Sequence, residues 1–122
     1  APLNEVLAAG MIMLTGWKGN STFIDTMCGS GTLPIEAAMI AADIAPGLLR
    51  HSFGFMKWND FNRSLWKKTL DESKRKIINP AEIIIGSDIS AKAIQIAESN
   101  TKRAKVNSTI QFDVCDFKNY QM

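Results

Sequence analysis

The sequence lacks the features that mark membrane-spanning, secreted and zinc-binding proteins. No apolar run approaches the roughly 18 residues that a membrane span needs, and no signal peptide pattern is present. The 122 residues include only two cysteines, Cys28 and Cys115, which excludes a disulfide-dense scaffold, and no CxxC pair suggests zinc. With 46% hydrophobic and 21% charged residues, the composition is that of an ordinary globular domain. We therefore expect a cytoplasmic protein with no membrane or metal partner.

Strand-like and helical segments alternate along the chain. Apolar spacing predicts helices over 4–15, 33–44, 59–77 and 90–104, and strands over 21–25, 83–88 and 109–114. This alternation predicts parallel βαβ units in a doubly wound α/β sheet, with the strands in the spatial order third, second, first. The first strand would then lie on an open edge. The open edge, and a start without methionine, predict that residues 1–122 are the N-terminal half of such a sheet in a larger protein.

Each predicted strand ends near an aspartate: Asp25, Asp88 and Asp116. Ligands of open α/β sheets bind at the carboxyl ends of the strands. The segment Asp25–Thr32 (DTMCGSGT) is a small-residue loop between a strand and a helix, which allows close backbone approach to a ligand and presents helix N–H donors. An aspartate at a single strand end can be a turn cap, but aspartates at three consecutive strand ends are harder to explain in this way. Together with the loop they predict a cofactor site.

The loop departs from the dinucleotide-binding pattern. That pattern requires a third glycine, and its place after Gly29 and Gly31 is taken by Pro34. S-adenosylmethionine, which has no phosphate, fits better. Asp88 is placed to accept hydrogen bonds from both ribose hydroxyls, and Asp116 is placed to accept a hydrogen bond from the adenine amino group. The remaining predicted cofactor-binding residues, which would hold the methionine end or line the loop, are Asp25, Cys28, Gly29, Ser30, Gly31 and Thr32.

The loop also resembles a known family. Together with Ile35-Glu36-Ala37-Ala38 and Ala42–Gly47 (ADIAPG), the Asp25–Thr32 loop resembles the RNA methyltransferases that carry a THUMP domain, most closely the bacterial large-subunit rRNA guanine-N2 methyltransferases. Ala1-Pro2-Leu3 and Gly86-Ser87-Asp88-Ile89 match the same family. The sequence departs from it at Thr26, where proline is usual, and this changes loop stiffness more than chemistry.

The resemblance implies a Rossmann-like domain that uses S-adenosylmethionine to methylate an exocyclic amine of RNA, guanine N2 of large-subunit rRNA. It also implies a THUMP domain before residues 1–122 and an Asn-Pro-Pro-Tyr-like motif after a fourth strand, both outside this sequence. No catalytic residue is therefore assigned, and residues 1–122 alone are expected to be inactive. A DNA amino-methyltransferase, a Rossmann-like oxidoreductase and a non-catalytic nucleotide-binding module remain as alternatives.

Two further features admit two interpretations each. Cys28 is either a nucleophile or a small residue of the cofactor loop, and the second is favoured because no lysine or histidine lies beside it to lower its pKa. Residues 43–79 hold eight basic and four acidic residues around Trp58, Phe61 and Trp66. This segment is either an RNA-facing surface or a helix with an aromatic inner face and a solvated outer face. His51, the single histidine, is expected in a loop.

Overall fold

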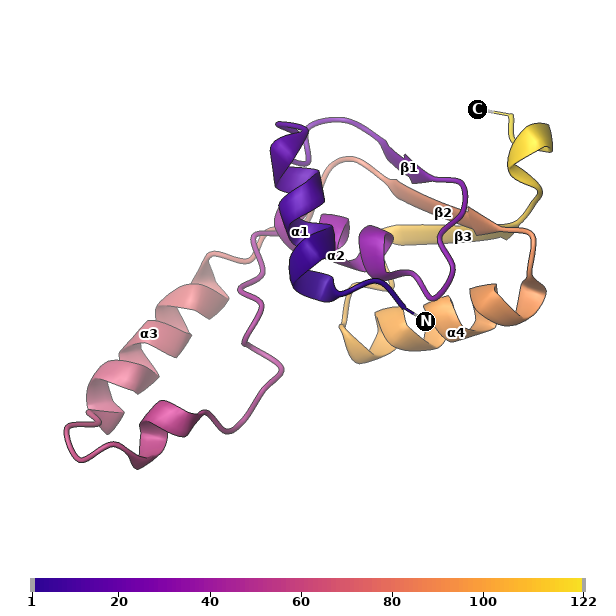
Figure 1. Ribbon diagram of the computed structural model, residues 1–122. Helices are drawn as coiled ribbons and strands as arrows, with labels where there is room; N and C mark the ends of the chain where they lie inside the picture. Colours follow the sequence, from indigo (N-terminus) through magenta and orange to yellow (C-terminus); the bar gives the residue numbers. More distant parts are fainter. Residues whose placement is uncertain (1, 122) are drawn as a thin grey trace.

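The structure, a computed structural model that describes residues 2–121, is built on a parallel sheet of three strands. They are β1 (Phe23–Asp25), β2 (Ile84–Asp88) and β3 (Ile110–Val114), in the order β1-β2-β3 (Figure 1). The predicted α/β class and strand order are thus confirmed, and β1 lies at an edge. Ala1 of the Ala1-Pro2-Leu3 motif and Met122 lie outside the described residues.

The helices agree with the predicted pattern except at their ends. They are α1 (Glu5–Leu14), α2 (Thr32–Ala41), α3 (Arg63–Arg75) and α4 (Ala91–Arg103), with two 3₁₀ turns, η1 (Gly54–Lys57) and η2 (Phe117–Asn119). α3 begins later than predicted because Asn62 caps it, accepting a hydrogen bond from Leu65 N at 3.0 Å. Ser90 caps α4, as predicted. No helix within residues 2–121 is both long and apolar enough to cross a membrane.

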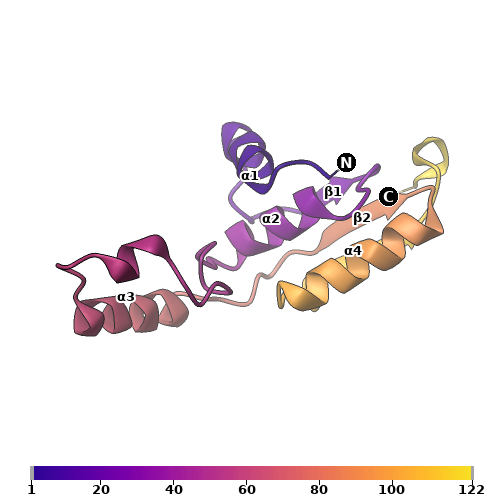
Figure 2. The ribbon, with the colours of Figure 1, turned by 60° about the horizontal axis from the view of Figure 1, so that its bottom comes forward.

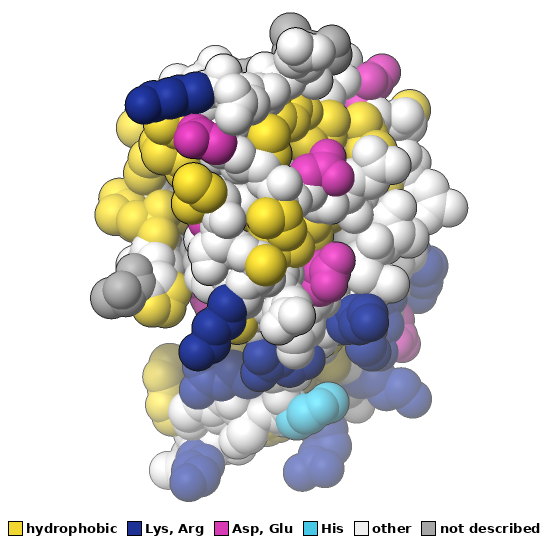
Figure 3. Space-filling model, turned by 90° about the vertical axis from the view of Figure 1, so that its right-hand side faces the viewer, with side chains coloured by type: hydrophobic (Ala, Val, Ile, Leu, Met, Phe, Trp, Pro, Cys, Tyr) yellow, Lys and Arg dark blue, Asp and Glu magenta, His cyan; other side chains and the backbone are white. Residues whose placement is uncertain are grey.

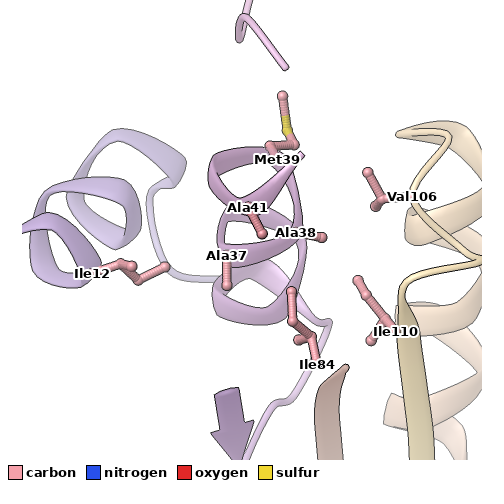
Figure 4. Close-up of a cluster of buried hydrophobic side chains, with 8 residues drawn as sticks. All are labelled: Ile12, Ala37, Ala38, Met39, Ala41, Ile84, Val106 and Ile110. Atoms are coloured by element: carbon pink, nitrogen blue, oxygen red, sulfur yellow. The ribbon is translucent and has the colours of Figure 1, made fainter. Parts of the chain in front are cut away.

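The core lies around α2, which packs between α1 and the sheet (Figure 4). Its inward positions are small: Ala37 and Ala38 are completely buried, so the helix approaches both neighbours closely. Ile12 of α1 contacts one side of this cluster, and Ile84 of β2 and Ile110 of β3 contact the other. A nearly all-apolar helix is expected where several elements cover it. The packing positions the start of α2 at the carboxyl edge of the sheet, and with it the Asp25–Thr32 segment, which we call the glycine loop.

The segment between α2 and β2 projects from the rest of the molecule. Figures 1 and 2 show η1 and α3 extending away from the sheet, joined to it by two stretches without helix or strand. These stretches meet where Ile78 N–H donates to Ala42 O at 2.9 Å, so the chain leaves and returns at one place. No residue of α3 is buried. We call residues 43–77 the arm.

Candidate functional site

The structure brings the predicted site residues to one edge of the sheet. Because the strands are parallel, their carboxyl ends lie side by side: Asp25 is the last residue of β1, Asp88 the last of β2, and Asp116 follows β3 by two residues. Cys115 N–H donates to Asp88 O at 2.9 Å, which fixes the end of β3 to β2. Their role in cofactor binding stays a prediction.

Asp88 connects the glycine loop to the start of α4. One carboxylate oxygen accepts from Gly29 N–H at 2.9 Å, and the other accepts from Ser90 N–H, also at 2.9 Å. The bond to Gly29 spans 59 positions of sequence. A carboxylate offers about four acceptor positions, so two remain for hydroxyl donors of a ligand. Asp88 therefore holds the loop in place and can still accept further hydrogen bonds.

The glycine loop takes a shape that few other residues allow. Gly29 and Gly31 both have positive φ, +54° and +86°, where a Cβ is strained. Cys28 N–H donates to Ser87 O at 2.8 Å, and Gly31 N–H donates to Cys28 O at 2.9 Å. Gly31 is the N-cap of α2 and has no side chain to cap it, so the free N–H groups of the first turn face this loop. A Cβ built at Gly29 would meet no atom within 4 Å, so the loop is open there.

Burial raises the pKa of the Asp25 carboxyl above its usual 3.8; the bond from Met27 N–H opposes this rise and the negative charge of Asp88 adds to it. At neutral pH the ionised Asp25 is thus less favourable in the folded protein than in the unfolded chain. Two carboxylates near one another give this edge negative charge. Such an edge favours a positively charged ligand.

Asp25→Asn is expected to stabilise the folded protein without ligand. Because the pKa of Asp25 is higher in the folded protein than in the unfolded chain, its contribution to stability is most favourable below pH 3.8. This contribution is lost as the pH rises through the folded-state pKa. The amide keeps an oxygen for Met27 N–H but carries no charge. The gain in unfolding free energy should be small in acid and larger at neutral pH, measured by urea unfolding across this range. Exposed Asp113→Asn is the control; equal gains at both positions would contradict the prediction.

Cys28 lies in the loop but is a poor nucleophile. Its side chain is 7% exposed, and burial, with the charges of Asp25 and Asp88, raises its pKa to about 12. Nucleophilic cysteines need the opposite shift, because the thiolate is the reactive form. The interpretation of Cys28 as a small loop residue is favoured. Cys28 and Cys115 are both free thiols.

Iodoacetamide is expected to modify Cys115 long before Cys28. With a pKa of about 12, roughly one Cys28 thiol in a thousand is ionised at pH 9, and access is restricted as well. The measurement is the alkylated fraction of each cysteine peptide by mass spectrometry over time. The urea-unfolded chain is the control, in which both should react alike. Fast native modification of Cys28 would reopen the nucleophile interpretation.

Asp116, Ser30 and Thr32 lie at or beside the same edge, whereas His51 lies in the arm. Asp116 is half-buried and accepts from Lys118 N–H at 3.0 Å, which caps η2. Ser30 and Thr32 line a pocket of about 630 Å³ between α1, α2 and α4. Pro34, which occupies the third glycine position of the dinucleotide pattern, is fully buried in the first turn of α2. His51 is exposed in a loop, as predicted.

Sequence reasoning missed the partners of this loop. Asn100 of α4 donates from Nδ2 to Ser30 O at 3.0 Å and accepts from Arg103 Nη2 at 2.7 Å. The segment Pro2–Val6 lines the 630 Å³ pocket with them. Ser87 is fully buried, and its hydroxyl has no partner among residues 2–121. Asn100 lies within the helix predicted over 90–104, but no local signal joins it to a loop 70 positions away. Residues 2–121 hold no cluster of three metal-ligating side chains.

Comparison with known proteins identifies relatives of this chain. Two proteins named ribosomal RNA large subunit methyltransferase K/L are similar to it: one from Psychromonas ingrahamii is 47% identical over 97% of the chain, and one from Shewanella baltica is 43% identical over 95%. The chain spans only 16% and 17% of the length of these curated relatives.

Solved structures show the same fold. A protein described as a "possible methylase" from Clostridium difficile 630 superposes over 100% of the chain with a TM-score of 0.92 and 41% identity. The crystal structure of SMU.472 complexed with SAH matches 99% of the chain, with a TM-score of 0.91 and 28% identity. A predicted N6-adenine-specific DNA methylase from Listeria monocytogenes also covers 99%, with a TM-score of 0.92 and 35% identity. The chain spans 32% of each of these structures.

The fold is therefore the Rossmann-like fold of S-adenosylmethionine-dependent methyltransferases, as predicted. The family with the description "RMKL-like, methyltransferase domain" matches residues 1–122, the whole chain. The resemblance found in the sequence to large-subunit rRNA methyltransferases is confirmed at this level. This chain belongs to the RMKL-like methyltransferase domain family.

Proposed function

We propose that this chain binds S-adenosylmethionine at the carboxyl edge of β1–β3. We further propose that it forms part of the catalytic domain of an enzyme that methylates guanine N2 in large-subunit rRNA. The observation that carries the proposal is the position of Asp88, which holds the glycine loop against β2 while two of its acceptor positions stay available. The SAH complex of a structure with the same fold and the names of the curated relatives support it.

The residues of the edge match the parts of this cofactor. S-adenosylmethionine supplies a methyl group on a positively charged sulfur. The carboxylates of Asp25 and Asp88 give the edge the complementary charge. In this proposal Asp88 accepts from the ribose hydroxyls, Asp116 accepts from the adenine amino group, and the loop Cys28–Thr32 contacts the methionine end. The loop is open beside Gly29, where a ligand can approach the backbone.

The chain's contribution to transfer is binding and orientation. Methyl transfer to a neutral amine needs a lone pair on nitrogen in line with the methyl group, and positioning accounts for much of the rate. The protonated Cys28 thiol is unsuited to a covalent route. The residues that hold the target amine are proposed to lie outside residues 1–122, in the Asn-Pro-Pro-Tyr-like motif.

The test is to assay the full-length protein for ligand and product. Calorimetry should show binding of S-adenosylhomocysteine and none of NAD; the reverse result would favour the oxidoreductase alternative. With unmethylated large-subunit rRNA and labelled S-adenosylmethionine, digestion and mass spectrometry should find N2-methylguanosine. DNA is assayed as a second substrate because the Listeria structure is described as a predicted N6-adenine-specific DNA methylase. Methyladenine in DNA, without methylated rRNA, would favour the DNA amino-methyltransferase alternative. Cofactor binding with no transfer to either nucleic acid would indicate a non-catalytic module.

A further inference from the structure

We propose that the arm, residues 43–77, is a surface for single-stranded RNA, with a base stacked in its aromatic hollow and phosphates held by its lysines and arginines. The inference rests on the proposed function, since RNA is the substrate proposed there. It assigns to the arm a role separate from the cofactor edge.

The arm carries an aromatic hollow that belongs to no core. A cavity of about 290 Å³ opens between η1 and α3, lined mainly by apolar side chains: Phe55, Trp58, Phe61, Leu65 and Trp66. The rings meet edge-on or tilted, with Phe55 and Trp66 centroids 4.9 Å apart. Trp58 is 67% exposed, and none of these residues joins the core around α2. Aromatic rings that keep one side open to solvent are available for stacking with nucleobases.

The arm also concentrates the positive charge of the chain. It holds eight basic and four acidic residues, a net charge of +4, whereas the whole chain carries +2, so the remaining residues sum to −2. In Figure 3 most of the visible Lys and Arg side chains lie in the lower part of the view, while most carboxylates lie above them. Seven of the eight basic residues lie within residues 57–76, on or next to the aromatic hollow and α3: Lys57, Arg63, Lys67, Lys68, Lys74, Arg75 and Lys76.

This combination fits RNA better than another protein surface. A polyanion complements a basic projection, and each phosphate neutralised by a lysine releases a counterion and so favours binding. Asp60 lines the hollow as well, so a phosphate is repelled there and a base is the group that enters. Lys57 directly precedes the exposed Trp58 in the chain, and the Arg50 guanidinium lies 5.0 Å from the centroid of the Phe53 ring. Stacking tolerates any base, so we expect little sequence preference from the arm itself.

The test measures binding of a fluorescein-labelled oligouridylate to full-length protein by fluorescence anisotropy at several salt concentrations. Trp58→Ala should weaken binding about fivefold or more through lost stacking. The double variant Lys67→Gln/Lys68→Gln, at two exposed positions of α3, should make the negative slope of log K against log salt shallower by about 1.4, because each lost phosphate contact removes roughly 0.7 from its magnitude. The double variant Lys92→Gln/Lys102→Gln removes the same charge from exposed positions of α4 and should leave the slope unchanged.

Each outcome decides one question. If the arm variants bind oligouridylate like the wild type, the inference is wrong. If Trp58→Ala lowers the melting temperature but not the affinity, the arm packs against another part of the protein and the inference is also wrong. An equal loss in the α4 control would show general electrostatic attraction instead of a surface on the arm. Failure of the proposed function is distinguishable, since there the wild type itself would not bind S-adenosylhomocysteine or methylate rRNA.

Discussion

Asp88→Asn is expected to weaken S-adenosylhomocysteine binding by about 1.5–3 kcal/mol, roughly ten- to over a hundredfold. The carboxylate accepts from Gly29 N–H and Ser90 N–H, both at 2.9 Å, and both oxygens are needed as acceptors. An asparagine amide has one oxygen and one NH₂ group, so it must point a donor at one of these N–H groups. The loop then loses an anchor, and the proposed ribose hydroxyls lose a charged acceptor at the same time.

Calorimetric titration of the full-length protein measures this effect. Asp113→Asn makes the same chemical change on neighbouring β3, at an exposed position, and should leave the affinity unchanged. Circular dichroism separates a lost site from a lost fold, since the secondary structure should persist in both variants. Undiminished affinity in Asp88→Asn would contradict the proposed role of Asp88 in cofactor binding.

Gly31→Ala is expected to lower the local stability of α2 by about 2–5 kcal/mol. Its φ of +86° costs an L-residue roughly 1–2 kcal/mol. The new Cβ would also come within 3.0 Å of Ala97 Cβ and 3.4 Å of Ala97 Cα on α4, and forcing an extra methyl into a packed interface costs about 1–3 kcal/mol. Gly31 is therefore needed both for the turn into α2 and for the close approach of α4.

Gly29→Ala provides the matched control for this prediction. Gly29 also has positive φ, +54°, but a Cβ there meets nothing within 4 Å, so only the conformational cost applies. Native-state hydrogen exchange of α2 amides in the full-length protein measures both variants as local opening free energies. Equal losses at the two positions would show that contact with Ala97 contributes nothing.

The sequence predicted the strand order and the edge at which the three aspartates lie, because both follow from general rules of parallel sheets. Right-handed crossovers fix the order of β1–β3, and parallel strands must end at one edge, which brings Asp25, Asp88 and Asp116 together. The hydrogen bonds of Asp88 and of Asn100 with the glycine loop were not predictable, since they join residues 59 and 70 positions apart. Helical periodicity shows that a side chain is polar or apolar, but it does not name the partner.

The arm shows the same limit more clearly. The periodicity of 59–77 predicted an aromatic face, but it did not specify what that face would pack against. In the structure Trp66 packs on Phe53, the N-cap of η1, and on Phe55 within η1, away from the sheet. The aromatic face is therefore an inner face of the arm itself, and part of it, including Trp58, stays open to solvent.

The hydrogen bond between Ala42 and Ile78 has a consequence for how this domain can vary. Because the ends of residues 43–77 are already side by side, the closure entropy of a shorter connection in their place changes only with the logarithm of its length. The arm can therefore be lengthened, shortened or replaced with little effect on the stability of the sheet. Such an arrangement lets the arm change in length and sequence while the glycine loop, held by Asp88 and Asn100, stays as it is.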